Sequence, residues 1–221
     1  MPVFNEIRSI DKILSTVLSQ QLKDWKKQVI VVDDGSTDGT REKLVRWEKR
    51  CTIIYLPFNQ GKGAALVKGF AVATGNIILI QDADLEYNPD DYATLLAPFS
   101  DDRVDVVYGS RFLGPHLSTM YIYMMGNKFV TLMTNLLYNT NITDMETGYK
   151  VFRRSVLDAI TIRARRFDFE PEFTAKILKV GYQIYEVPIS YYGRKFSEGK
   201  KLTWRDGIAA LGTLFYQRFF L

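Results

Sequence analysis

The sequence has one cysteine, Cys51, and one histidine, His116, among its 221 residues. A single cysteine cannot form an intramolecular disulfide or a thiolate zinc site, and a single histidine excludes metal motifs built on paired histidines. Any metal ion bound by this chain would therefore need oxygen ligands, which Mg²⁺ and Mn²⁺ prefer.

Long apolar runs and a strong charge of one sign are also missing. No stretch reaches the roughly 18 consecutive apolar residues that a spanning helix needs, and the first residues lack the basic and apolar parts of a signal peptide. Twenty-nine basic and 25 acidic residues leave a net charge of +4, which is too small for a nucleic-acid-binding surface. These absences predict a cytoplasmic protein with no nucleic-acid partner.

Short β-branched runs alternate with segments of helical periodicity in the first half of the chain. Strands are predicted at 29–32, 53–56, 77–80 and 104–108, with helices at 7–18, about 40–50, from Gly61 onward, and 89–99. This alternation predicts an α/β fold with a parallel sheet covered by helices. Further along, the pattern predicts an amphipathic helix over 117–138, a strand over 186–192 and an amphipathic C-terminal segment.

Acidic residues follow two of these strands, at the sheet edge where open parallel sheets bind ligands. DDGSTDGT occupies 33–40, and Asp82, Asp84 and Glu86 follow the strand at 77–80. Alternate residues of an extended segment point the same way, so these three carboxylates would lie together and need a cation such as Mg²⁺ or Mn²⁺. The alternative is a turn of solvated acids before Pro89.

Six motifs, in order, resemble the inverting GT-A glycosyltransferases of family 2. They are PVFNE (2–6), DDGSTDGT (33–40), NQGKGAALVKG (59–69), DADLE (82–86), GSR (109–111) and TDMETGYKVFRR (143–154). The resemblance is most specific to the dolichyl-phosphate mannose synthase and polyprenyl-phosphate glycosyltransferase group, and it continues through 186–207. It implies a GT-A nucleotide-diphospho-sugar transferase fold, with a mostly parallel central sheet flanked by helices. We expect one domain over 1–221, with a nucleotide-sugar half (about 1–110), an acceptor half (about 111–200) and a C-terminal amphipathic segment (about 201–221).

The resemblance also implies roles for individual residues on the donor side. The donor-binding residues would be Pro2, Phe4, Glu6, Val32, Asp33, Asp34, Asp82 and Ala83. The metal ligands would be Asp84 and Glu86, with Asp82 beside them, holding Mg²⁺ or Mn²⁺. Lys62 either reaches a donor phosphate or is solvated at the start of its helix.

On the acceptor side, the resemblance assigns Arg111, Arg194 and Lys200 to phosphate groups of the donor or the lipid. A solvated charged turn is the alternative for Lys200. Asp144 is a candidate general base or an orienter of Arg111, and Asp84, Asp144 and Arg111 form the expected catalytic set. A hydroxyl acceptor would require a base, either Asp144 or Glu146. Two further acids, Glu170 and Glu172, either take part in catalysis or cap a helix.

The expected function is metal-dependent, inverting transfer of a hexose, with mannose favoured, from a nucleoside-diphosphate sugar to a polyprenyl or dolichyl phosphate. The expected partners are GDP-mannose or UDP-glucose, the lipid phosphate, the cytoplasmic membrane face and a membrane-anchoring subunit. The alternatives are a UDP-glucose enzyme, a soluble hydroxyl acceptor in polysaccharide synthesis, and an inactive nucleotide-sugar-binding subunit. The C-terminal segment, with Trp204, Ile208, Leu211 and Phe215 near one face, suits a bilayer, a partner subunit or the core.

One departure from the family lies at the first motif. The resembling enzymes have an apolar strand ahead of it, whereas here Met1 directly precedes Pro2. We therefore expect a chain extended upstream of Met1, by residues that its gene encodes there, to be more stable.

Overall fold

The computed structural model describes residues 1–115, 121–194 and 204–221, without the side chains of Ile122, Trp204 and Arg205. Within these described residues, seven strands form two sheets. The first contains β1 (Pro2–Val3), β2 (Ile30–Asp33) and β3 (Thr52–Tyr55), and the second contains β4 (Ile77–Leu79), β5 (Val106–Ser110), β6 (Lys150–Arg153) and β7 (Ile184–Pro188). The helices are α1 (Ile10–Ser19), α2 (Thr40–Leu44), α3 (Lys62–Val72), α4 (Tyr92–Leu96), α5 (Tyr121–Tyr138), α6 (Val156–Ala159), α7 (Phe169–Val180) and α8 (Trp204–Phe219), and 3₁₀ turns cover Val45–Trp47, Pro89–Asp91 and Ala97–Ser100.

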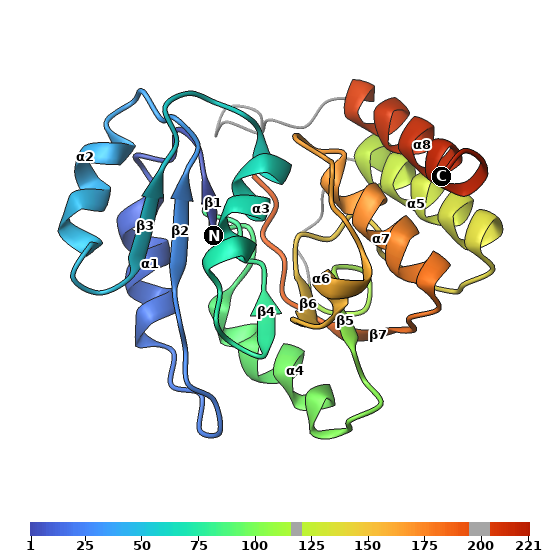
Figure 1. Ribbon diagram of the computed structural model, residues 1–221, viewed down its shortest axis with the longest axis horizontal. Helices are drawn as coiled ribbons and strands as arrows, with labels where there is room; N and C mark the ends of the chain where they lie inside the picture. Colours follow the sequence, from blue (N-terminus) through green and yellow to red (C-terminus); the bar gives the residue numbers. More distant parts are fainter. Residues whose placement is uncertain (116–120, 195–203) are drawn as a thin grey trace.

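The first sheet is parallel, in the order β1-β2-β3, and the second has the order β4-β6-β5-β7. In the second sheet β5 and β7 are parallel, whereas β6 runs antiparallel to both β4 and β5. Figure 1 shows α1 and α2 beside the first sheet, and α5, α7 and α8 gathered at the far end of the second. The predicted α/β class is present, and each predicted strand has a counterpart, the one expected at 186–192 lying at Ile184–Pro188. The alternation pattern did not predict β1 and β6.

Two apolar clusters form most of the core. One joins α1, α4 and strands of both sheets, with Ile10, Ile13 and Leu14 fully buried. The other packs α3, α6 and α7 against the second sheet around Phe152, Phe169 and Phe173. Each cluster joins elements that are distant in the sequence. This packing fixes the positions of the carboxyl ends of β2 and β4 relative to each other.

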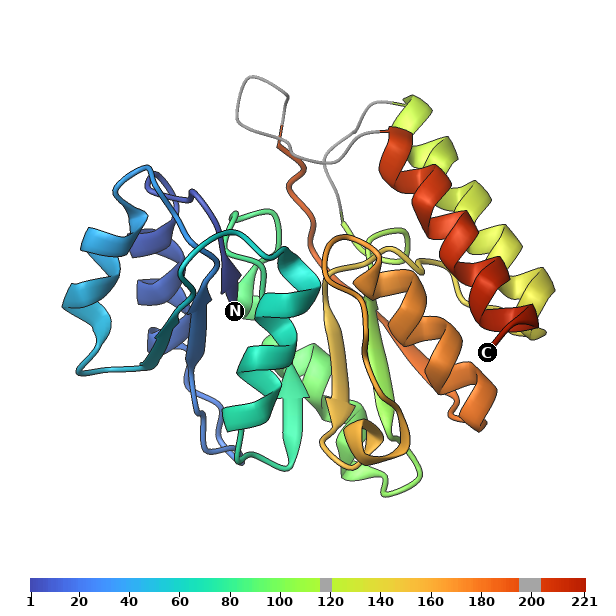
Figure 2. The ribbon, with the colours of Figure 1, turned by 45° about the horizontal axis from the view of Figure 1, so that its top comes forward.

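The helices α5 and α8 lie side by side in both views (Figure 2). Ala210 and Leu214 of α8 are buried in a cluster with residues of α5 and α7, whereas Ile208 and Phe215 are exposed. A row of exposed apolar side chains also follows α5, namely Tyr121, Met125, Phe129, Leu132 and Leu136. Within the described residues, no helix combines the length and hydropathy needed to cross a bilayer.

A cavity of about 440 Å³ separates the start of β2 from β4. Its lining includes Met1, Val29, Ile30 and Ile77, and the chain begins beside it, between β2 and β4 (Figure 1). The Met1 ammonium is buried, donates to the Ile30 carbonyl oxygen at 2.9 Å, and has its pKa lowered to about 6 by loss of hydration. Since Pro2 pairs with Val32 in parallel register, residues added before Met1 would continue β1 into this cavity.

We predict that adding Val-Ile-Val-Ile before Met1 raises the melting temperature by about 5 °C or more. Each buried aliphatic side chain contributes about 1.5–3 kcal/mol, and 1 kcal/mol shifts the melting temperature of a domain this size by about 2–4 °C. Differential scanning calorimetry measures the shift. A Gly-Ser-Gly-Ser extension is the matched control, and equal melting temperatures for the two extended proteins would contradict the prediction.

Candidate functional site

Asp33 and Asp34, at the end of β2, both accept hydrogen bonds from other parts of the protein. Asp33 is fully buried and its Oδ2 accepts hydrogen bonds from Arg41 Nε at 2.9 Å and Nη2 at 2.7 Å. Asp34 accepts from the backbone nitrogens of Gln60 and Gly61 at 2.7 and 2.8 Å. Both carboxylates therefore fix the loops around the carboxyl end of β2. Asp33 Oδ1 is buried without a hydrogen-bond partner in the described part of the chain.

The segment after β4 forms a turn, so the expectation of an extended run is wrong, although the charges of Asp82 and Glu86 do act on Asp84. Leu85 has φ +67°, in the left-handed region, which reverses the chain between its neighbours. Asp84 Oδ1 accepts from the Glu86 nitrogen at 3.1 Å across this turn. As a result Asp82 contacts Lys62, whereas Asp84 and Glu86 contact Arg194.

Three carboxylates from distant parts of the chain converge on the Arg194 guanidinium. Its Nη1 and Nη2 donate to Glu6 at 3.3 Å each, and Nη2 also donates to Asp84 Oδ2 at 3.1 Å. The Glu86 carboxylate lies 3.8 Å from Arg194 Nε, and it accepts from the Arg194 backbone nitrogen at 2.8 Å and the Tyr191 hydroxyl at 2.7 Å. We call Glu6, Asp84, Glu86 and Arg194 the carboxylate cluster.

The carboxylate cluster has the chemistry of a divalent-cation site. Burial, followed by the charges of Asp82 and Glu86, raises the pKa of Asp84 to about 7 despite the opposing Arg194. The local field is thus negative, and the donors are carboxylate oxygens, which suit Mg²⁺ or Mn²⁺. Among the described residues, no three acidic, histidine or cysteine side chains are placed to hold a metal ion together. In the carboxylate cluster, the Arg194 guanidinium lies between the carboxylates. The residues fit a cation at Asp84, whereas both Glu86 oxygens already accept from protein donors.

Lys62 is not solvated, because its side chain is 13% exposed and lies between two carboxylates, and its contact with a donor phosphate stays a prediction. Its Nζ lies 2.9 Å from Asp82 Oδ1 and 2.7 Å from Glu170 Oε1. The two acids outweigh burial and raise the pKa of Lys62 well above its ordinary value. Gly148 packs directly against the Asp82 carboxylate, since a Cβ at this position would lie 2.4 Å from Asp82 Oδ2. Lys62 thus holds Asp82 and Glu170 together.

Arg111 and Asp144 form a tight buried ion pair. Asp144 is fully buried and accepts from Arg111 Nε and Nη2 at 2.7 Å each, and from the Arg111 backbone nitrogen at 3.0 Å. The guanidinium lies 5.2 Å from the Tyr191 ring centroid. Glu186 accepts from the Thr143 and Asp144 nitrogens and so fixes the loop that carries Asp144. This geometry favours Asp144 as the orienter of Arg111 over a general base.

Two buried ionisable groups lie in the TDMETGYK segment. Lys150 Nζ donates to the carbonyl oxygens of Met145 and Thr147 at 2.7 and 2.8 Å, and burial lowers its pKa to about 8. Glu146 Oε1 is shielded and has no hydrogen-bond partner among the described residues. Burial, reinforced by the Glu170 charge, raises the pKa of Glu146 to about 7.

The raised pKa of Glu146 predicts that the free energy of unfolding falls as the pH rises. Its carboxyl stays protonated to about pH 7 when folded but only to about pH 4.5 when unfolded, so the folded state binds more protons in that interval and stability falls as pH rises through it. We expect Glu146→Gln to reduce this fall in the free energy of unfolding, measured by urea titration from pH 4.5 to 8. Glu42→Gln, at an exposed position, is the control. An equal slope in both variants would contradict the assignment.

The remaining predicted residues are scattered. Val32 and Ala83 have core side chains with 1% and 4% exposure, packed against apolar neighbours. A donor could therefore be contacted only by the backbone at these two positions, and their donor role stays a prediction. Pro2 and Phe4 are half-buried beside the Glu6 turn. Lys195, Lys200 and Lys201 lie outside the described residues. Glu172 accepts from the backbone of Arg163 and Ala164 and pairs with Lys176, which is a structural role.

Sequence reasoning missed a buried network beneath the Asp82–Glu86 turn. The Tyr92 and Tyr149 hydroxyls donate to Gln81 Oε1 at 2.7 and 2.8 Å, and the Gly148 nitrogen donates to the Tyr87 hydroxyl at 2.7 Å. These tyrosines are spread along the sequence without a shared spacing. The one local signal is Gln81 itself, a polar residue directly after an apolar strand.

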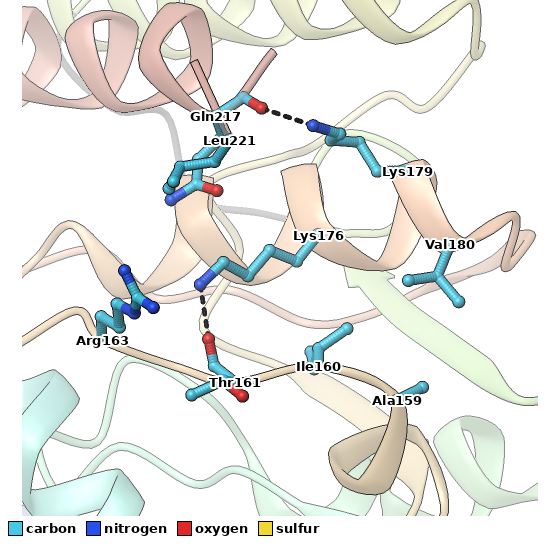
Figure 3. A pocket seen from close by; sticks show the side chains of 9 residues that line it. All are labelled: Ala159, Ile160, Thr161, Arg163, Lys176, Lys179, Val180, Gln217 and Leu221. Carbon is cyan, nitrogen blue, oxygen red and sulfur yellow. Dashed lines mark hydrogen bonds between the residues drawn. The ribbon is translucent and has the colours of Figure 1, made fainter. Parts of the chain in front are cut away.

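A second cavity, of about 270 Å³, lies on another part of the surface. Figure 3 shows its lining from the 159–163 segment, α7 and the end of α8, with Lys176 donating to the Thr161 carbonyl and Lys179 to that of Gln217. None of its lining residues belongs to the predicted site.

Two curated proteins are similar to this chain over most of its length, in agreement with the family resemblance of its sequence motifs. Over 217 residues the chain is 28% identical to the undecaprenyl-phosphate mannosyltransferase of Micrococcus luteus, covering 90% of this chain and 85% of that protein. It is 27% identical over 212 residues to the polyprenol monophosphomannose synthase of Mycolicibacterium smegmatis, covering 90% and 78%.

Solved structures share the fold. Glucosyl-3-phosphoglycerate synthase from Mycobacterium tuberculosis, crystallised with Mn²⁺, uridine diphosphate and glucosyl-3-phosphoglycerate, superimposes with a TM-score of 0.75 at 18% identity, covering 98% of this chain and 77% of that one. This likeness confirms the GT-A architecture. The family model for "Glycosyl transferase family 2" matches residues 1–161. The chain therefore belongs to glycosyl transferase family 2 and is a glycosyltransferase of the GT-A fold.

Proposed function

We propose that this protein transfers a hexose, with mannose favoured, from a nucleoside-diphosphate sugar to the phosphate of a polyprenyl phosphate at a membrane surface. The observation that carries the proposal is the similarity, over nine-tenths of the chain, to two relatives named for mannosyl transfer to polyprenyl phosphates. The exposed apolar side chains of α5 and α8 support the membrane part, since such side chains can enter the headgroup region of a bilayer.

In this proposal the donor binds over the carboxyl ends of β2 and β4, the edge at which ligands bind open α/β sheets. Asp84, with Asp82 nearby, would hold Mg²⁺ or Mn²⁺, which when bound would supply positive charge to a departing diphosphate. Glu6, Asp33 and Asp34 form the wall on the β2 side. The bidentate Arg111–Asp144 pair fixes one guanidinium at the end of β5, where it can meet an acceptor phosphate.

A polyprenyl phosphate does not require a protein base. The second pKa of a phosphate monoester is near 6, so the acceptor is largely a dianion at neutral pH and already nucleophilic. The protein then aligns the acceptor oxygen with the anomeric carbon, and in-line displacement inverts the anomeric configuration. The full burial of Asp144 in its pair with Arg111 supports a positioning role for this residue.

The test is an incubation with Mn²⁺ or Mg²⁺, a short polyprenyl phosphate and each of several nucleotide sugars, GDP-mannose and UDP-glucose among them, followed by mass spectrometry of the organic phase. We expect a hexosyl-phosphoryl lipid from one donor. Donor hydrolysis without a lipid product would favour the soluble-acceptor alternative. Neither product nor hydrolysis would favour the inactive-subunit alternative.

A further inference from the structure

Two arginines contact carboxylates near the site, and their geometries differ. Arg111 donates two bonds of 2.7 Å to one carboxylate, the short, forked arrangement of a strong pair. Arg194 spreads one guanidinium over three carboxylates at 3.1 to 3.8 Å, and its Nε is buried without a hydrogen-bond partner in the described chain. Arg111 is therefore a fixed element, whereas Arg194 is held weakly by each partner.

The backbone around Arg194 is anchored independently of its guanidinium. The Arg194 nitrogen donates to Glu86 Oε1 at 2.8 Å, and the Tyr192 nitrogen donates to the Glu86 carbonyl at 3.0 Å. Tyr191 adds a hydroxyl bond to Glu86 Oε2 and a bridge to Tyr87. The guanidinium can thus leave the carboxylates by side-chain rotation while the main chain stays in place.

Arg194 also contacts the oxygen that a divalent ion needs. Its Nη2 donates to Asp84 Oδ2 at 3.1 Å, while Asp84 Oδ1 accepts from the Glu86 nitrogen. A guanidinium and a divalent ion are both positive, so they cannot share Asp84 Oδ2 without repulsion. Binding of the ion and retention of the Arg194 contact therefore oppose each other.

We propose that Arg194 is a displaceable internal cation of the carboxylate cluster, which occupies the ion's place against Asp84 and is released when Mg²⁺ or Mn²⁺ binds. The proposal rests on the metal site of the proposed function but not on the identity of the donor sugar or the acceptor. It gives Arg194 a positioning role that couples ion binding to the freeing of a guanidinium beside the site, where a diphosphate would be its next partner.

The test is the affinity of the full chain for Mn²⁺ without nucleotide, measured by the electron paramagnetic resonance signal of free Mn²⁺. Arg194→Met removes the competing charge and keeps an apolar stem, so we expect Mn²⁺ to bind about tenfold more tightly than to the wild type. Arg194→Lys keeps a charge and should bind nearly as the wild type does. Arg103→Met, which removes an exposed arginine paired with Asp101, is the control.

Equal or weaker Mn²⁺ binding by Arg194→Met, or no binding by either protein, would overturn the proposal. A second measurement covers the case in which this variant does not fold. The Nε–Hε resonance of Arg194 in the wild type, assigned by its absence in Arg194→Lys, should shift on titration with Mg²⁺ as the guanidinium leaves, and an unchanged resonance at saturating Mg²⁺ would also overturn the proposal. Neither readout involves glycosyl transfer, so a failure of the proposed reaction is distinguishable from a failure of this inference.

Discussion

Replacing Asp84 by asparagine is expected to lower kcat/KM for glycosyl transfer by about a thousandfold, or ~4 kcal/mol of transition-state stabilisation. The substitution keeps the shape of the side chain but removes the negative oxygen on which the proposed ion depends. Donor binding should lose its dependence on Mn²⁺ at the same time. Steady-state kinetics and calorimetric titration of the donor, with and without Mn²⁺, measure the two effects.

The same substitution should leave the fold intact. Burial and the neighbouring acids raise the pKa of Asp84 to about 7, so at pH 8 the folded protein carries a charge that its surroundings disfavour. Asp84→Asn relieves that charge, and we expect an unchanged or higher melting temperature. Asp102→Asn, at a fully exposed carboxylate, is the control for activity. Unchanged metal dependence in Asp84→Asn would contradict the assignment of the ligand.

Asp144→Asn is expected to destabilise the protein by about 3–5 kcal/mol, because it leaves the Arg111 charge buried without its partner. The melting temperature should fall by roughly 6–20 °C at about 2–4 °C per kcal/mol. Urea unfolding measures the free-energy change. The matched control is Asp101→Asn, which breaks the exposed Arg103–Asp101 pair, where a change of about 0–1 kcal/mol is expected.

A double variant separates the two roles considered for Asp144. If Asp144 orients Arg111, adding Arg111→Met to Asp144→Asn should recover part of the lost stability, because no unpaired buried charge then remains. If Asp144 contributes nothing to holding Arg111, the single variant should keep its stability even where kcat collapses. That second pattern would contradict the positioning role.

The strand ends that carry the site were predictable because β-branched runs stop abruptly at acids. Val29–Val32 leads into Asp33 and Asp34, and Ile77–Ile80 leads into Asp82, and the structure ends β2 and β4 at or near these points. Strand β6 was not predictable in this way. Its four residues, Lys150–Arg153, begin with a fully buried lysine and end with an arginine, so only two apolar residues stand between them and no apolar run marks the strand.

The side-chain partners could not be predicted because they depend on one backbone reversal and on contacts over long sequence separations. The reversal at Leu85 redirects the chain between Asp84 and Glu86, although the sequence spacing predicts one extended face. Lys62 meets Glu170 and Arg194 meets Glu6 only after the two sheets are assembled. Local sequence patterns predicted which acidic residues lie at strand ends, whereas the tertiary fold decides which lysine or arginine each of them contacts.

The central claim concerns the acceptor, and a competition experiment tests it most directly. The purified protein is given its donor, Mn²⁺ and equal concentrations of a short polyprenyl phosphate and 3-phosphoglycerate, the latter chosen because the solved structure of the same fold contains its glucosylated form. Mass spectrometry then quantifies both products in one reaction, with Asp84→Asn as the blank. We expect the hexosyl-phosphoryl lipid to form at least about a hundredfold faster, a preference of ~2.7 kcal/mol. Equal rates, or a preference for the soluble acceptor, would contradict the account.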